Sequence, residues 1–321
     1  MATATTAQER SAELNVLVRK QRSLWQDAWY RLRRNHAAVA GMVIVVLFMV
    51  IALIVPLLTD WKIINDPINR QDTAHNLMEP FWVNSPYRYP DYPLGSDQLG
   101  RDILTRLLWS TRISMLVGFV PVSIIFLMGV SIGLVAGYNG GWIDQLLMRI
   151  TDVIYAFPDL LFLFIIMATL RNTAVGDIQG GLLLIFVAIA IVNWVGLARL
   201  VRGQVLSLKE REFVEAARSI GAPATRIMTR HLFPNLLAPV IVSVAFGIPN
   251  AMLAEATLSF FGIGIKPPTP SWGVMINEGF TVFSTSAWPV LLPALCISVV
   301  MLAFTFLGDG LRDALDPRMK A

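Results

Sequence analysis

The sequence contains few charged residues, one cysteine and few histidines. Only 15% of its 321 residues are Asp, Glu, Lys or Arg, whereas a soluble domain carries roughly a quarter. Cys296 lies alone in an apolar run, so a disulfide framework is excluded and we interpret it as a packing residue. His36, His75 and His231 are scattered without the spacing of metal ligands, so no metal site is predicted. The net charge of +4 is too small to indicate nucleic-acid binding.

Motifs for nucleotide chemistry and for enzyme catalysis are also missing. The sequence contains no GxxxxGK[ST] phosphate loop, so this chain is not expected to bind or hydrolyse ATP. No Ser/His/Asp set or histidine-rich cluster occurs in its apolar blocks. We therefore predict no catalytic residue, no metal and no cofactor in this chain, and no enzymatic activity of its own.

Long hydrophobic runs are abundant. The chain is 55% hydrophobic with a mean hydropathy of +0.60, and about 20 apolar residues suffice to cross the ~30 Å hydrocarbon core. Pro158 and Asp159 interrupt one block near its start, where we expect Asp159 to cap the following helix. We predict an all-α integral membrane protein with six transmembrane helices, at Ala37–Leu58, Ile113–Tyr138, Val153–Leu170, Gly181–Leu200, Leu236–Phe261 and Val290–Leu307.

The distribution of Lys and Arg predicts how these helices are oriented. Basic residues are concentrated before the first span, between the fourth and fifth spans and in the C-terminal tail, which favours cytoplasmic termini. "SLWQDAWYRLRRN", residues 23–35, interleaves aromatic and basic residues as an amphipathic helix against membrane lipid does. The predicted segments are a cytoplasmic tail with this interfacial helix (1–36), the first span (37–58), an extracytoplasmic cap (59–112), a five-helix core (113–307) and a cytoplasmic tail (308–321).

The cytoplasmic loop 201–235 contains strong helix signals. Ser207 followed by Glu210 is a capping-box pattern, which predicts a helix that begins near Leu208. This helix is expected to end at Ile220, because Gly221 can supply a left-handed cap.

A second short helix is expected to follow in the same loop. Pro223 suits the first turn of a helix, where its missing N–H costs nothing, and Pro234 is expected to end it at the membrane. The first helix is expected to have two stripes. The apolar stripe, which should face the spans, consists of Phe213, Ala217 and Ile220. The charged stripe, which should face a partner, consists of Arg211, Glu215 and Arg218.

The pattern Glu215-Ala216-Ala217 followed by Gly221 resembles the EAA loop of ABC-importer permeases. In that family the loop contains a coupling helix that docks in a groove of the ATPase subunit. The resemblance therefore implies that Arg211 and Arg218, together with those four residues, contact an ATPase. This copy departs from the family pattern at two positions of the second helix, His231 and Phe233.

Four further stretches resemble the dipeptide/oligopeptide/nickel permease family, and its second permease subunit in particular. They are "PLGSDQLGRDILTRLLWSTRISM", "GGWIDQLLMRITDVIYAFPDLL", "AEATLSFFGIGIKPPTPSWG" and "LGDGLRDALDPR". The resemblance implies a type I importer permease in the prokaryotic inner membrane. Its partners would be a second permease subunit, two ATPases that bind ATP and Mg, and an extracytoplasmic solute-binding protein. The solute stays open among dipeptides, oligopeptides and nickel complexes.

Other polar residues have two interpretations each. Glu255 and Asn193 lie within predicted spans and could line the pathway or bond to a neighbouring helix. Asp97, Arg101 and Asp102 belong to an alternating-charge run, which is either a salt-bridged surface helix or an outer-face brace of the pathway mouth.

The main alternative function is a secondary transporter driven by an ion gradient. Such a protein is expected to contain inverted repeats and several buried acidic residues. Only Glu255 and Asp159 fit that pattern, and the loop 201–235 would be unexplained.

Overall fold

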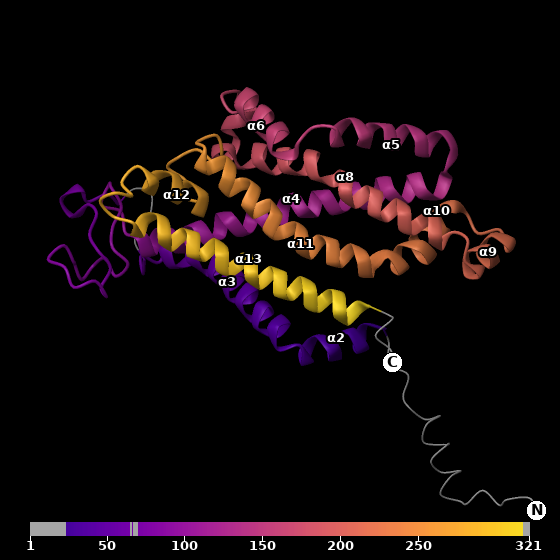
Figure 1. The fold of residues 1–321 in the computed structure, drawn as a ribbon, viewed down its shortest axis with the longest axis horizontal. Helices are drawn as coiled ribbons and strands as arrows, with labels where there is room; N and C mark the ends of the chain where they lie inside the picture. Colours follow the sequence, from indigo (N-terminus) through magenta and orange to yellow (C-terminus); the bar gives the residue numbers. More distant parts are fainter. Residues whose placement is uncertain (1–23, 65, 67–69, 317–321) are drawn as a thin grey trace, which may run out of the picture.

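The computed structural model describes residues 24–64, 66 and 70–316. The protein is an elongated bundle of helices, with α9 (Glu212–Ser219) at one end and the largely irregular segment 70–102 at the other (Figure 1). The first part of the predicted N-terminal tail, residues 1–23, and the last residues, 317–321, lie outside the described residues.

Among the described residues, five helices are long and apolar enough to cross a membrane, and each overlaps a predicted span. Most of their ends lie beyond the predicted limits, because an apolar block marks only the part of a helix that crosses the hydrocarbon core. The widest difference is at α4, which begins at Ile103 rather than at Ile113 because the Asp102 carboxylate caps its first turn. These helices are α3 (His36–Asp60), α4 (Ile103–Asn139), α8 (Leu182–Leu208), α11 (Phe233–Phe260) and α13 (Trp288–Leu315).

The sixth predicted span is a broken helix rather than a straight one. Its residues are divided between α5 (Gly141–Tyr155) and α6 (Asp159–Leu170), which meet at an angle of 80°. Pro158 explains the break, because proline lacks an N–H and disfavours helical geometry in the residue before it. The prediction that Asp159 caps α6 is wrong: Pro158 occupies the cap position, and no side chain bonds there.

Shorter helices flank and connect these spans. The proline-rich loop after α11 folds back onto the end of the bundle opposite α9, where Trp272 is only 1% exposed. These elements are α2 (Leu24–Arg34), η1 (Thr73–His75), α7 (Ala174–Asp177), η2 (Ile178–Gly181), α10 (Ala224–Arg226), the π-helical η3 (Ile227–Leu232) and α12 (Trp272–Phe280).

The core is centred on α8, which packs along α4. Gly129, Gly133 and Gly137 recur every fourth residue on α4 and bring its backbone against α8. A Cβ atom on Gly133 would lie 2.6 Å from the Ala198 carbonyl oxygen and 2.7 Å from the Val201 Cβ. Small residues at this spacing allow two membrane helices to approach closely, where van der Waals contact drives association.

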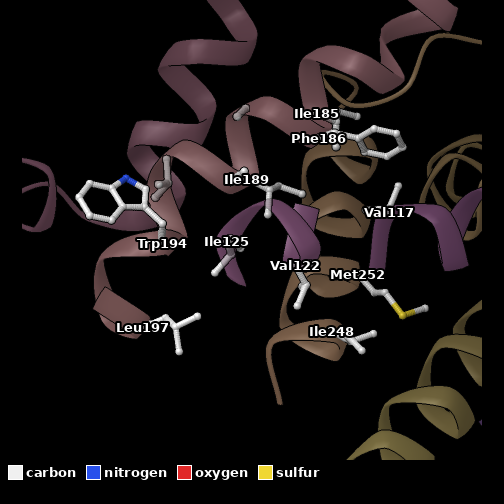
Figure 2. Close-up of a cluster of buried hydrophobic side chains, with 14 of the residues drawn as sticks. Val117, Val122, Ile125, Ile185, Phe186, Ile189, Trp194, Leu197, Ile248 and Met252 are labelled. Atoms are coloured by element: carbon white, nitrogen blue, oxygen red, sulfur yellow. The ribbon is translucent and has the colours of Figure 1, made fainter. Parts of the chain in front are cut away.

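Apolar side chains of three helices fill the space beside this contact. Figure 2 shows the cluster in which side chains of α4, α8 and α11 gather. They include Val117, Val122 and Ile125 from α4, Ile185, Ile189, Trp194 and Leu197 from α8, and Ile248 and Met252 from α11.

We predict that Gly133→Leu destabilises the protein, because overpacking a tight contact costs about 1–3 kcal/mol. The matched control is Gly203→Leu on α8, since a Cβ atom on Gly203 has no neighbour within 4 Å. Thermal unfolding in detergent should show a lower midpoint for Gly133→Leu alone. Equal midpoints for the two variants would show that the glycine contact is not limiting.

Candidate functional site

At one end of the molecule lies α9, a short helix in the connection between two spans (Figure 1). The predicted capping box is wrong, because Ser207 lies inside α8, and α9 begins at Glu212 with Arg211 at its N-cap. The span continues past the predicted start because Val205 is fully buried against Gly137 at the end of α4. Within the described structure, no side chain caps the start of α9.

The C-terminus of α9 has the glycine cap that the sequence predicts. Gly221 has a φ of +76°, and its N–H donates to the Arg218 carbonyl at 2.9 Å. The Ala222 N–H donates to the Ala217 carbonyl at 3.1 Å. These two bonds form a Schellman motif, which ends the helix and fixes the direction of the following chain.

The buried face of α9 differs from the predicted one. Val214 and Ala217 are buried in the main cluster, whereas Phe213 is 40% and Ile220 84% exposed. The prediction that Phe213 and Ile220 face the spans is therefore wrong. The small Val214 and Ala217 side chains, three residues apart, let α9 lie flat against η3.

The exposed face of α9 contains five of the six predicted coupling residues. Ala217 is the buried one, while the other five reach the surface; they are Arg211, Glu215, Ala216, Arg218 and Gly221. The Arg218 guanidinium lies 5.7 Å from the centre of the Tyr138 ring at the end of α4. This surface therefore combines charge with the exposed side chains of Phe213 and Ile220.

The second helix of the loop continues into the membrane span. Pro223 is the N-cap of α10, one position before the predicted first turn. The prediction that Pro234 ends this helix is wrong, because one helical stretch runs from Ala224 to Phe260. The π-turn of η3 pairs the Phe233 N–H with the Met228 carbonyl. This wider register brings Pro234, which has no N–H, into the first turn of α11 without a break.

A cavity of about 970 Å³ lies beside α11. Its wall comes from α4, α8 and α11, and from α2 and the end of α13. Asn193 lines it, with its side-chain amide donating to the Ile189 carbonyl at 2.9 Å, whereas the neighbouring Trp194 is buried. The uncharged polar side chains that α8 and α11 contribute to its wall are Asn193, Gln204, Asn235, Ser243 and Asn250.

Glu255 lies outside this cavity wall. Its side chain is 1% exposed and accepts hydrogen bonds from the Ser259 hydroxyl at 2.6 Å and the Ser271 hydroxyl at 2.7 Å. Ser271 also caps α12 through the Val274 N–H. The carboxyl group thus joins α11 to the fold-back loop in this conformation.

At the end of the bundle opposite α9, the alternating-charge run is buried rather than exposed. Arg101 and Arg106 each bond both to Asp97 and to Glu278 of α12, at 2.6–2.8 Å. The interpretation as a salt-bridged surface helix is therefore wrong. The α12 partner Glu278 was not found by sequence reasoning, because it is distant in sequence and no charge spacing links it to the run.

Asp102 lies outside this ion-pair network and caps α4. Its carboxylate accepts from the Leu104 N–H at 3.2 Å, the Thr105 N–H at 3.0 Å and the Thr105 hydroxyl. Burial raises the pKa of Asp102, and these hydrogen bonds oppose that shift. Asp102 is thus a helix cap that lies next to this ion-pair network in the sequence.

Two ion pairs in the half of the bundle near α9 attach α5 to α8. Arg202 forms a bidentate pair with Asp144 at 2.5 and 2.7 Å, and Arg199 contacts Asp152 at 2.7 Å. Sequence reasoning missed both. The available signal was that Asp144 and Asp152 are eight residues apart on α5, which places them on neighbouring faces of the helix.

The described residues contain no group of three His, Cys, Asp or Glu side chains able to hold a metal ion. His75 bonds instead to Asp72, at 2.8 Å, and this hydrogen bond lowers the pKa of Asp72.

Comparison with known proteins identifies the class to which this architecture belongs. Residues 129–321 match the family described as binding-protein-dependent transport system inner membrane component, and residues 23–80 match the N-terminal TM domain of oligopeptide transport permease C. The chain belongs to this family of inner-membrane permease components, within its dipeptide/oligopeptide permease C branch.

Relatives align over nearly the whole chain. The dipeptide transport system permease protein DppC of Bacillus subtilis (strain 168) is 40% identical over 98% of this chain and 92% of the relative. OppC, the oligopeptide transport system permease protein of the same strain, is 33% identical over 98% of this chain and 96% of the relative. A solved chain of the MetNI methionine ABC transporter is 18% identical, with a TM-score of 0.48 over 66% of this chain and 96% of that chain.

We predict that Glu278→Ala destabilises the fold by about 3–5 kcal/mol, because it leaves two buried arginines with one carboxylate. The control is Asp152→Ala, whose pair with Arg199 is half exposed and should contribute less than about 1 kcal/mol. Chemical denaturation in mixed micelles measures both. Similar losses in the two variants would contradict a special role for the buried network.

Proposed function

We propose that this chain is the membrane-spanning permease subunit of an ATP-driven importer of peptides in the prokaryotic inner membrane, with both termini cytoplasmic. The observation that carries this proposal is the position of α9, an eight-residue helix fixed at one end of the bundle with a charged face exposed. The names of the relatives, which are dipeptide and oligopeptide permeases, favour a peptide as the solute over a nickel complex.

In this proposal α9 is the contact for a partner ATPase, which binds ATP and Mg. The Schellman motif and the burial of Val214 and Ala217 make α9 rigid relative to the chain that follows. The unbroken helical stretch from Ala224 to Phe260 then connects α9 to the wall of the cavity. A displacement of α9 by ATP-driven closure of the ATPases would thus be transmitted to α11 and would expose the pathway alternately to each side of the membrane.

The cavity beside α11 is the proposed portion of the pathway that this chain supplies. Lipid tails cannot satisfy amide side chains such as Asn193 and Asn250 at membrane depth. A second permease subunit facing this wall would close the pathway, and an extracytoplasmic binding protein would deliver the peptide. An ion-driven secondary transporter is less well supported, because the buried Glu255 is held by two serines outside this cavity wall.

We predict that Glu215→Lys lowers peptide uptake at least tenfold and weakens co-purification of the ATPase, because it reverses charge on the exposed face of α9. The matched control is Glu210→Lys, which makes the same change in the exposed turn before the helix. Uptake of labelled dipeptide and ATPase recovery are measured at equal membrane levels of the chain. Wild-type behaviour of Glu215→Lys in both assays would refute the docking role.

We also predict that Gly221→Pro abolishes coupling. Proline cannot adopt a φ of +76° and cannot donate the bond that Gly221 makes to Arg218. Gly221→Asn should retain most uptake, since asparagine tolerates the left-handed conformation. Peptide-stimulated ATP hydrolysis in the reconstituted importer distinguishes the two variants, and full stimulation with Gly221→Pro would show that the cap does not set the geometry of docking.

A further inference from the structure

We propose that the outward face of α2 binds the phosphate groups of anionic phospholipids. This surface, the aromatic–arginine face, consists of Trp29, Tyr30, Arg33 and Arg34. All four side chains are exposed, and they occupy the side of α2 opposite to the buried Ala28 and Leu32.

The position of α2 next to the membrane is fixed by the start of the first span. Only Asn35 separates α2 from α3, and its side-chain oxygen caps α3 by accepting from the Ala38 N–H at 3.1 Å. The strongly apolar α3 must enter the hydrocarbon core within a few residues of this cap. Arg33 and Arg34 therefore lie at the depth of the lipid headgroups.

The opposite face of α2 is anchored to the protein. Ala28 and Leu32 form a buried cluster with Ala38 of α3 and Ala314 of α13. Gly310 permits this contact, because a Cβ atom there would lie 2.2 Å from the Ala38 Cβ. In Figure 1, α2 accordingly lies beside the C-terminal end of α13. The aromatic–arginine face is thus held in a fixed orientation on the exposed side of α2, where Tyr30 and Arg34 also border a hollow next to Asp313 of α13.

The two arginines are arranged for phosphate binding. The Arg33 guanidinium lies 4.5 Å from the centre of the Trp29 ring, and that of Arg34 lies 4.2 Å from the Tyr30 ring. Stacking orders the plane of a guanidinium and leaves its N–H edge free for bidentate bonds to an anion. Within the described chain neither arginine forms a salt bridge.

Lipid fits this surface better than an acidic protein segment does. Tryptophan and tyrosine favour the headgroup region, because the apolar part of each ring contacts lipid while its N–H or O–H group stays hydrated. Anionic lipid attracts adjacent basic residues, and Arg19, Lys20 and Arg22 precede the helix in the sequence.

Native mass spectrometry of the purified full chain, titrated with phosphatidylglycerol or phosphatidylcholine, tests the proposal. Each basic residue near an anionic surface contributes roughly a fivefold factor in binding, so Arg33→Gln/Arg34→Gln should weaken phosphatidylglycerol retention about 20-fold. Retention of phosphatidylcholine should change little. The control is Arg226→Gln/Arg230→Gln, which removes two exposed arginines elsewhere and should retain phosphatidylglycerol as the wild type does.

If the glutamine variant aggregates, Arg33→Lys/Arg34→Lys is used in its place. It keeps the charge but loses the planar edge, so we expect an intermediate loss of phosphatidylglycerol. The proposal would be overturned if the glutamine variant retained phosphatidylglycerol as the wild type does. The same holds for the lysine variant when it is used in place of the glutamine variant. An equal loss of phosphatidylglycerol in the control would also overturn the proposal. Normal lipid retention by the glutamine variant, together with loss of a partner subunit when that variant is purified from membranes containing its partners, would assign the face to a protein instead. Lipid retention is measured without transport, so this result is independent of the proposed importer function.

Discussion

The close backbone contact between α4 and α8 is the constraint on which the other features depend. Three glycines leave no room for side chains between the two helices, so their relative position is set within a fraction of an ångström. Each helix then positions one end of the bundle. The N-terminal end of α4 contributes Arg106 to the buried ion pairs with α12, and the C-terminal end of α8 leads directly into α9. A change at α9 is therefore applied to a rigid pair of helices rather than to a loose bundle.

Charge is used differently at the two ends of the molecule. The ion pairs at the end opposite α9 are buried and join the segment before α4 to α12, so removal of one partner leaves an uncompensated charge in a dry environment. The pairs between α5 and α8 are partly exposed to solvent and contribute less to stability. The end opposite α9 is thus held in one arrangement, whereas α5 can separate from α8 at a smaller energetic cost. In the proposed importer, this asymmetry favours opening at the α9 end.

The sequence was sufficient to predict the five straight spans and the glycine cap of α9, because apolar length and a left-handed glycine are local signals. The buried face of α9, the role of Pro234 and the partner of Arg101 depend on tertiary contacts, which local sequence signals do not reveal. Phe213 and Ile220 have the spacing of a buried stripe, but the smaller Val214 and Ala217 occupy the contact. Pro234 has the character of a helix terminator, yet a π-turn accommodates it. Glu278 became a partner of Arg101 only through the fold-back of α12.

The two helices that flank α9 differ in stiffness, and this difference determines where a displacement of α9 takes effect. The long apolar stretch of α8 is regular, has no internal proline and is the most enclosed of the spans. By contrast, α11 follows a π-turn and contains Pro239 and Pro249, each of which removes a backbone hydrogen bond. A load on α9 would consequently deform α11 before α8. Because Pro239 and the adjoining turns of α11 line the cavity, the deformable helix is the one that faces the proposed pathway, and the rigid helix provides the surface against which it moves.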